Sequence, residues 1–233
     1  MRGPITSSDC LDMESATRAQ PNLPDFDLES EMMAIHGLPV AGIDEAGRGP
    51  WAGPVVVAAV VLDPNRIPEG LNDSKKLTPQ AREDRFEEIN ATARVSVVVG
   101  QVRRIDRDNI LQATLWGMRA AFRTLEVPQA TALIDGNAVP RRFPGAARAV
   151  IGGDTRSLSI AAASIVAKVT RDRIMMKLAK RYRGYGWETN KGYGTAEHAN
   201  GIERHGVCPH HRRSFAPIRR ILAARGAIAE VEG

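Results

Sequence analysis

Apolar residues occur in short runs separated by turn residues from about residue 38 onward. The longest unbroken run, Val55–Leu62, has eight residues, is rich in valine and lies between Pro54 and Pro64. A run of this kind predicts a strand that is buried on both faces. Shorter apolar runs predict four more strands, at Val40–Asp44, Arg94–Val102, Ala130–Ile134 and Ala147–Ile151.

Helix start signals precede several segments whose apolar residues recur at helical spacing. Thr78 followed by Pro79 predicts an N-cap and a helix to about Asn90. Asp106 is expected to cap a long helix to about Leu125. The remaining predicted helices follow a Ser157 cap through about Arg181 and cover Phe26–His36, Thr195–His205 and Phe215–Ala224.

The order of these elements predicts an α/β fold in which helices cover a mixed sheet, with a helical C-terminal extension. Residues 37–233 are expected to form one domain, including a basic helical part from about residue 184. Residues 1–36 lack apolar periodicity over most of their length and predict a flexible acidic tail. This tail lacks the apolar core of a secretory signal, and its acidity argues against a mitochondrial transit peptide.

Composition narrows the class of protein. The chain has 233 residues, of which 43% are hydrophobic and 25% charged, which suits a buried core and excludes a collagen, a coiled coil and a fully disordered chain. An eight-residue apolar run is too short for a membrane span, which needs about 20. Two cysteines cannot form a disulfide framework. We therefore expect a cytoplasmic protein without a membrane partner, and a monomer.

Charge is distributed unevenly along the chain. The net charge is −5 over residues 1–36, −1 over residues 37–140 and +11 over residues 141–233. A basic block of this size suggests a polyanionic partner such as nucleic acid. The alternative is a solvated basic surface.

Carboxylates follow three of the predicted strands. Asp44 and Glu45 come at the end of the first strand, Asp135 precedes Gly136, and Asp154 lies just before a helix start. Strand ends flanked by glycine are where α/β sheets build their sites. Each residue could instead be a turn aspartate or a helix cap, and for Asp154 the cap is the stronger alternative.

Four converging carboxylates would repel one another unless cations neutralise them. An all-oxygen ligand set favours Mg²⁺ or Mn²⁺ over zinc. Two such ions about 3.5–4 Å apart can activate a water and stabilise the leaving oxygen in phosphodiester cleavage. Zinc could be considered near the C-terminus, but the spacing there lacks the usual second pair of ligands, at His205, Cys208, His210 and His211. His198 receives no role.

The segment Gly47-Arg48-Gly49 combines backbone freedom with one guanidinium. Glycines on both sides let the backbone approach a ligand closely, and Arg48 supplies a fork of donors. An ordinary turn is the alternative.

Six segments, in this order, resemble bacterial ribonuclease HII. They are AGIDEAGRGPWAGPVVVAAVVL (41–62), NDSKKLT (72–78), ALIDGN (132–137), GDTRSLSIAAASIVAKVTRD (153–172), KGYGTAEH (191–198) and HRRSFAP (211–217). The sister family, ribonuclease HIII, usually has a GKG-type turn and an extra N-terminal domain. Arg48 and the short N-terminal segment favour HII.

The resemblance implies an RNase H-like fold and a metal-dependent endoribonuclease. Its substrates would be RNA–DNA hybrids and duplex DNA with an embedded ribonucleotide, which it would incise on the 5′ side in replication or repair. The family's metal-binding and catalytic carboxylates fall on Asp44, Glu45, Asp135 and Asp154, its substrate-reading turn on Gly47, Arg48 and Gly49, and its junction-sensing tyrosine on Tyr193.

These assignments agree with the chemistry of the substrate. Detecting one ribonucleotide requires sensing one 2′-hydroxyl, which a glycine turn can reach with backbone groups. Tyr193 lies between two glycines and could stack at an RNA–DNA junction, or could make core contacts instead. Lys75, Arg212 and Arg213 are candidate phosphate contacts, with a solvated surface as the alternative. The family often has lysine where Gly152 stands, so one nearby charge is missing here.

Two other functions compete with this one. A non-catalytic nucleic-acid binder would explain the basic C-terminal half but not the carboxylates at the strand ends. A Mg²⁺-dependent phosphotransferase is disfavoured because the chain has no G-x₄-G-K-[ST] loop.

Overall fold

A five-stranded mixed sheet forms the centre of the protein. The computed structural model describes residues 23–37 and 39–231. The strand order is β3-β2-β1-β4-β5; β1, β2 and β3 pair antiparallel, whereas β4 runs parallel to both β1 and β5. The sheet confirms the predicted α/β class and all five predicted strands, which are β1 Val40–Ala46, β2 Val55–Val61, β3 Arg94–Gly100, β4 Thr131–Asp135 and β5 Ala147–Val150.

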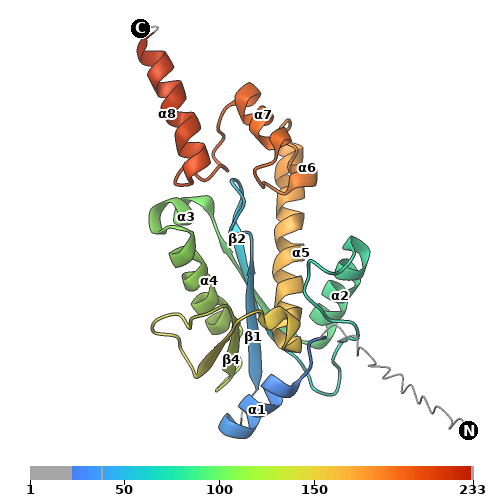
Figure 1. Ribbon diagram of the computed structural model, residues 1–233. Helices are drawn as coiled ribbons and strands as arrows, with labels where there is room; N and C mark the ends of the chain where they lie inside the picture. Colours follow the sequence, from blue (N-terminus) through green and yellow to red (C-terminus); the bar gives the residue numbers. More distant parts are fainter. Residues whose placement is uncertain (1–22, 38, 232–233) are drawn as a thin grey trace, which may run out of the picture.

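Helices cover both faces of this sheet (Figure 1). On one face, α5 packs with α2 against alternate residues of β2 such as Val56 and Val60. On the other face, α4 packs against Ile43 and Val57. The helices are α1 Asp27–His36, α2 Pro79–Thr92, α3 Val102–Asp108, α4 Ile110–Thr124, α5 Leu158–Arg181, α6 Trp187–Asn190, α7 Ala196–His205 and α8 Ala216–Val231.

The helix α5 approaches strand β1 at backbone contact distance. A Cβ atom added to Gly42 would lie 2.0 Å from the carbonyl carbon of Ser159. Only glycine fits at this position. The small residues at the start of α5 allow the helix to pack closely against the sheet. The strand and the helix that carry much of the site described below are therefore held in fixed register.

Two predicted helix caps are confirmed. The Thr78 side chain accepts a hydrogen bond from the Ala81 amide at 3.2 Å, and the Ser157 side chain accepts one from the Ile160 amide at 3.1 Å. Each side chain satisfies one of the amide groups that a helix leaves unpaired at its start.

The prediction that Asp106 caps one long helix is wrong. The segment forms two helices, α3 and α4, separated at Asn109, whose φ of 64° breaks the helical path. Asn109 is the cap of α4 and accepts a hydrogen bond from the Gln112 amide at 3.0 Å. Asp106 instead lies inside α3 and accepts hydrogen bonds from Ser214 and from the Arg213 amide. A long-range contact thus uses the carboxylate that sequence spacing assigned to a local cap.

The short helix predicted near the N-terminus is present as α1, and it is packed onto the domain. Glu29 of α1 is fully buried and accepts hydrogen bonds from the Ser157 hydroxyl at 2.6 Å and the Ser159 amide at 2.7 Å. The expectation of a free tail therefore does not hold for α1. Residues 1–22 of that predicted tail lie outside the described residues.

The C-terminal elements form a separate apolar cluster at the end of α5. Trp187 of α6, Ile202 of α7 and Ile218 of α8 are fully buried there with Tyr185. In Figure 1, α8 extends away from the sheet to the C-terminus. Among the described residues, none of the helices combines the length and the hydropathy needed to cross a membrane.

Candidate active site

Two parallel strands bring the first carboxylates together. Ile43 of β1 lies opposite Ile134 of β4, so Asp44 and Asp135 follow at the same level of neighbouring strands. Both strands run in the same direction, which places their carboxyl ends at one edge of the sheet. Asp44 is buried, with 5% of its surface exposed, and its carboxylate accepts a hydrogen bond from the Glu45 amide at 2.6 Å.

Asp154 reaches the same edge from a different element. It lies in a short 3₁₀ turn, Gly153–Thr155, between β5 and α5. The amide of Gly153 donates to the Asp135 carboxylate at 2.8 Å, which ties this turn to β4. Gly152, where the family often has lysine, adopts a left-handed φ of 62° that begins the turn. The turn thus orients Asp135 as well as presenting Asp154.

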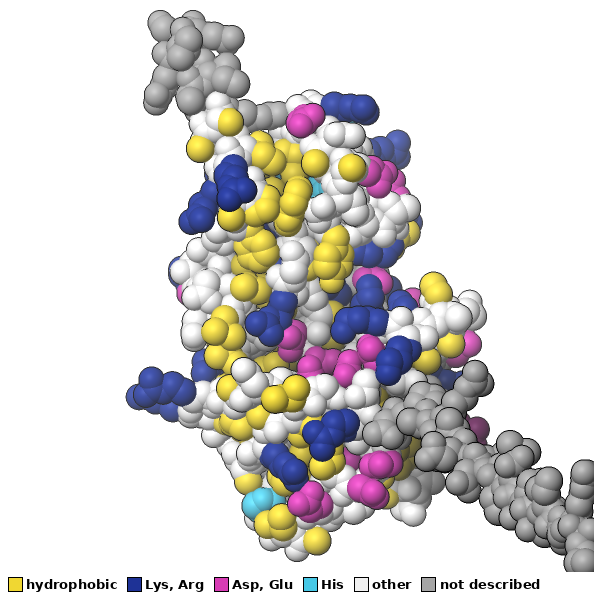
Figure 2. Space-filling view, viewed as in Figure 1, with side chains coloured by type: hydrophobic (Ala, Val, Ile, Leu, Met, Phe, Trp, Pro, Cys, Tyr) yellow, Lys and Arg dark blue, Asp and Glu magenta, His cyan; other side chains and the backbone are white. Residues whose placement is uncertain are grey.

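One cleft of about 410 Å³ gathers the predicted site residues. Figure 2 shows acidic side chains across the middle of this face of the molecule, with basic side chains beside them. The predicted residues that line it are the four carboxylates Asp44, Glu45, Asp135 and Asp154, the glycine turn Gly47, Arg48 and Gly49, and the side chains Tyr193 and Lys75. The lining also includes Ser74, Ser164, Lys168 and Arg171.

The electrostatics of the cleft favour cation binding. Burial, followed by the charges of Glu45 and Asp135, raises the pKa of Asp44 well above its ordinary value. Burial also raises the pKa of Glu45, although Arg48 opposes the shift. Burial and the charges of Asp73 and Asp135 raise the pKa of Asp154. A site that resists holding several negative charges is stabilised by added positive charge.

The donor chemistry fits hard divalent cations. The carboxylates that line the cleft offer only oxygen ligands, which suit Mg²⁺ and Mn²⁺. Within the described part of the chain, no three His, Cys, Asp or Glu side chains are drawn together into a closed metal cage. The fit therefore rests on the shared cleft and on its oxygen donors.

Arg212 holds the glycine turn from behind. Its guanidinium is fully buried and donates to the carbonyl oxygens of Gly47 at 2.6 Å, Arg48 at 2.9 Å and Gly53 at 2.9 Å. The expectation that Arg212 contacts the DNA backbone is therefore wrong, because its guanidinium is buried and hydrogen-bonded to carbonyl oxygens inside the protein. It is a positioning residue for the turn.

The carbonyl contacts also fix which way the turn presents its amides. In a trans peptide the C=O and N–H bonds point in opposite directions. The carbonyls of Gly47 and Arg48 point inward to Arg212, so the amides of Arg48 and Gly49 point outward. The turn lines the cleft, and these two amides are the donors it can offer to a substrate.

Gly47 has no room for a side chain. Its φ is 96°, and an added Cβ would lie 2.0 Å from Nε of Arg171. Arg171, also buried, donates to the carbonyls of Ala52, Pro54 and Lys191. Two buried arginines therefore brace the segment from residue 47 to residue 54.

Tyr193 projects at the rim of the cleft, with 48% of its surface exposed. Its loop is joined to the glycine turn by the Trp51 amide, which donates to the Gly192 carbonyl at 2.8 Å. An added Cβ on Gly194 would lie 2.1 Å from the Trp51 ring, so this position also requires glycine. Tyr193 is therefore an accessible ring on an internally fixed loop, rather than the core residue that was the alternative.

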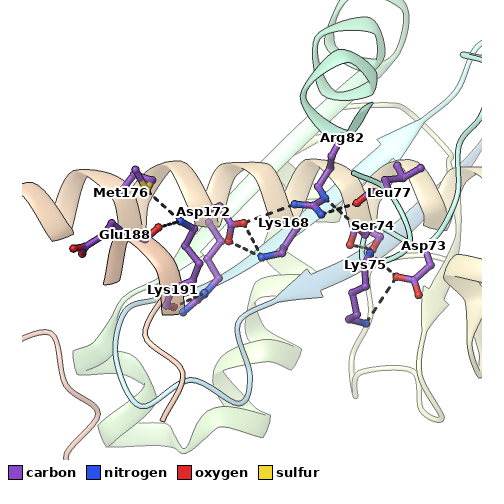
Figure 3. Close-up of polar contacts among 12 residues, drawn as sticks. Asp73, Ser74, Lys75, Leu77, Arg82, Lys168, Asp172, Met176, Glu188 and Lys191 are labelled. Atoms are coloured by element: carbon purple, nitrogen blue, oxygen red, sulfur yellow. Dashed lines mark hydrogen bonds and ion pairs between the residues drawn. The ribbon is translucent and has the colours of Figure 1, made fainter. Parts of the chain in front are cut away.

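Basic side chains surround the carboxylates. Lys75 lines the cleft and remains largely exposed; burial lowers its pKa, but Asp73 and Asp154 outweigh this and raise it. Lys168 of α5 bonds both carboxylate oxygens of Asp172 at 2.7 Å, and Arg82 approaches Asp172 at 4.0 Å (Figure 3). Arg213 is exposed but does not line the cleft.

Sequence reasoning missed three cleft residues on α5. Ser164, Lys168 and Arg171 line the cleft and recur at spacings of four and three, which places them on one face of the helix. The available signal was a polar stripe on a helix that is otherwise buried over its first half.

The histidines near the C-terminus do not form a zinc site. His211 and His198 contact each other through their Nε2 atoms at 3.1 Å, and the Cys208 amide donates to Nδ1 of His211 at 3.0 Å. The ring nitrogens are thus engaged in hydrogen bonds. Among the described residues, these histidines and Cys208 do not come together as a group of three that could hold a metal ion.

Solved structures share this fold. The crystal structure of ribonuclease H2 from Pyrococcus horikoshii OT3 superposes with a TM-score of 0.66 and 30% sequence identity, covering 79% of this chain and 97% of that one. The ribonuclease HII in the PCNA:RNase HII complex from Archaeoglobus fulgidus has a TM-score of 0.66 and 27% identity, covering 76% and 95%. Bst-RNase HIII in complex with Mn²⁺, at 22% identity and a TM-score of 0.56, shares the fold.

Sequence comparison gives the family. The family model for Ribonuclease HII matches residues 41–218. Ribonuclease HII from Jannaschia sp. (strain CCS1) is 55% identical over 199 residues, covering 85% of this chain and 98% of that protein. Ribonuclease HII from Azorhizobium caulinodans is 59% identical over 194 residues, covering 83% and 74%. The chain therefore belongs to the ribonuclease HII family of metal-dependent endoribonucleases, which cleave RNA in RNA–DNA hybrids and ribonucleotides embedded in DNA.

Proposed function

We propose that this protein hydrolyses the phosphodiester on the 5′ side of a ribonucleotide with two divalent ions, leaving a 3′-hydroxyl and a 5′-phosphate. The observation that carries the proposal is the single cleft lined by Asp44, Glu45, Asp135 and Asp154. Mg²⁺ or Mn²⁺, when bound, activates a water and stabilises the departing oxygen.

We assign the four carboxylates to two ions. Asp44 and Asp135 lie at the same level of neighbouring strands and would hold one ion between them. Glu45 and Asp154 would hold the second. The Gly153 amide, by donating to Asp135, keeps that carboxylate turned toward its partner. Arg48 donates to Glu45 at 3.3 Å and limits its motion.

Recognition of the ribonucleotide is assigned to the glycine turn and Tyr193. The outward amides of Arg48 and Gly49 are donors for the 2′-hydroxyl or the adjoining phosphate. The exposed ring of Tyr193 is available to stack at the RNA–DNA junction. Lys75 and Arg213 would contact phosphates without reading sequence. A monomeric state and a location in the cytoplasm stay predictions.

The test uses a DNA duplex with one ribonucleotide, incubated with Mg²⁺, Mn²⁺ or EDTA. An all-DNA duplex and a long RNA–DNA hybrid are the controls. We expect a nick on the 5′ side of the ribonucleotide that requires the metal and is absent from the all-DNA duplex. Binding without a nick under either metal would instead favour the non-catalytic binder.

A further inference from the structure

Two buried histidines connect the C-terminal elements to the loop that carries Tyr193. His198 of α7 contacts the Tyr193 carbonyl through Nδ1 at 2.9 Å and His211 through Nε2 at 3.1 Å. Both histidines are buried, with 0% and 1% of their surfaces exposed. Neither lies among the groups that line the cleft.

The donors around the rings determine where their protons are. An indole N–H and a backbone N–H can only donate. Trp187 Nε1 donates to Nε2 of His198 at 3.0 Å, so the proton of neutral His198 is on Nδ1 and is donated to the Tyr193 carbonyl. The Cys208 amide donates to Nδ1 of His211, so the proton of neutral His211 is on Nε2 and points to His198.

The loop that receives this hydrogen bond is held from outside at two places, at the Gly192 carbonyl by the Trp51 amide and at the Tyr193 carbonyl by His198. Tyr193 lies between Gly192, with a φ of 85°, and Gly194, and glycines allow many backbone conformations. Its other backbone bonds, from the Tyr193 amide to Asn190 and from the Thr195 amide to Tyr193, are local. Holding the Tyr193 carbonyl fixes the plane of the following peptide and so restrains the backbone from which the ring projects.

We propose that His198, kept in one tautomer by Trp187 and His211, is a positioning residue that sets the orientation of Tyr193 for recognition of the RNA–DNA junction. The proposal rests on the proposed function, in which Tyr193 contacts that junction. The next residue after His211 is Arg212, which holds the glycine turn. One buried dipeptide therefore supports both substrate-reading elements and sets their mutual position.

Two substitutions of His198 separate positioning from bulk packing. In His198→Asn the amide nitrogen can take the place of Nδ1 and still donate to Tyr193. In His198→Gln the amide extends to the Nε2 position, where its oxygen can accept from Trp187, and the donor to Tyr193 is lost. Both variants remove the ring, but only Gln keeps an acceptor for the Trp187 donor, so a purely structural role would favour Gln, whereas positioning of Tyr193 favours Asn.

The measurement is kcat/KM on the single-ribonucleotide duplex and on the long hybrid. We expect His198→Gln to lose about 10- to 100-fold on the single-ribonucleotide duplex, in line with a small displacement of a positioning group. On the hybrid, and for His198→Asn on both substrates, the loss should stay within about 3-fold. Equal losses for the two variants, or no loss for either, would overturn the proposal.

A double-substitution cycle tests whether His198 acts through Tyr193. In a Tyr193→Ala background, His198→Gln should have little further effect on the single-ribonucleotide duplex. Additive losses would show that His198 acts elsewhere. If His198→Gln does not fold, His211→Gln, which keeps a donor at the Nε2 position, is compared with His211→Asn, which does not.

A different result shows whether the proposed function itself is wrong. Unsubstituted protein that makes no metal-dependent nick contradicts the proposed function. The His198 comparison is then made by fluorescence anisotropy in EDTA, as the ratio of affinities for the single-ribonucleotide and all-DNA duplexes. A ratio that falls in His198→Gln and is kept in His198→Asn supports positioning, and an unchanged ratio in both overturns it.

Discussion

Glu29 caps the helix α5 from another part of the chain: its buried carboxylate bonds the Ser157 hydroxyl and the Ser159 amide at 2.6 and 2.7 Å. Replacing it by alanine leaves a buried hydroxyl and a helix-end amide without this partner. We expect Glu29→Ala to reduce the free energy of unfolding by about 2 kcal/mol, which corresponds to roughly 4–8 °C in Tm for a chain of this size. Thermal and denaturant unfolding would measure it.

Glu31 is the matched control on the same helix. It is exposed and pairs with Arg148 at the surface. Exposed ion pairs contribute little, so Glu31→Ala should change stability by less than about 1 kcal/mol. Similar losses for the two variants would contradict the capping role of Glu29.

Asp135→Asn isolates the charge of one carboxylate. The amide keeps an oxygen that can accept the Gly153 hydrogen bond, so the turn that carries Asp154 retains its anchor. Loss of one ionic ligand should lower cleavage by at least about 100-fold, with binding of the ribonucleotide-containing duplex retained. Single-turnover cleavage and binding in EDTA give the two quantities. A cleavage rate within about tenfold of that of the unsubstituted protein would rule out this metal-binding role.

Gly47 and Gly49 flank the same arginine but differ in the space around them. An added Cβ on Gly47 would overlap the Arg171 guanidinium, whereas on Gly49 its nearest neighbour is Cε1 of Tyr193 at 3.5 Å. We expect Gly47→Ala to destabilise the fold by about 2–3 kcal/mol or more, and Gly49→Ala to stay within about 0.5 kcal/mol. Denaturant unfolding of both variants measures the two free energies of unfolding. Equal values for the two variants would show that the turn rearranges to accommodate the added methyl group at Gly47.

Acid should weaken the fold through His211. Burial, followed by the charges of His198 and His210, lowers the pKa of His211 to about 4. The folded protein holds this ring neutral, whereas the same ring in the unfolded chain takes up a proton below its pKa of about 6.5. The free energy of unfolding is therefore unaffected by this ring above that pKa and decreases as the pH falls toward 4. The loss should amount to about 2–3 kcal/mol.

Unfolding free energies measured between pH 7 and pH 4 would show this slope. His211→Gln removes the titrating ring and should flatten the curve in that range. A slope unchanged by this substitution would assign the acid sensitivity to other groups, among them His198 and His210, whose pKa values burial also lowers.

Local chemistry explains which parts of the fold could be predicted from the sequence. The strands follow from short apolar runs, and the caps Thr78 and Ser157 from side chains beside their own helices. The failures depend on contacts distant in sequence. Asp106 binds Ser214 rather than its own helix end, and the break at Asn109 needs a positive φ that no periodicity reveals.

In the site, too, residues defined by local sequence could be predicted and residues defined by distant contacts could not. The four carboxylates could be predicted because they follow strands that end at one edge of the sheet. Arg212 was misassigned because an arginine in a basic segment looks like a surface residue, and only the fold shows that it is buried under the glycine turn. His198 carried no recognisable pattern, because its role depends on the side-chain donor Trp187 and on His211.

The contact between Arg212 and Gly47 also orders events during synthesis. The glycine turn is made early, but the guanidinium that holds its carbonyls belongs to a residue 165 positions later. A chain emerging from the ribosome acquires Asp154, the last of the four cleft carboxylates, well before Arg212. A chain that stops before Arg212 would carry all four cleft carboxylates without the guanidinium that holds the glycine turn. The glycine turn can therefore reach the arrangement described above only after residue 212 has been synthesised.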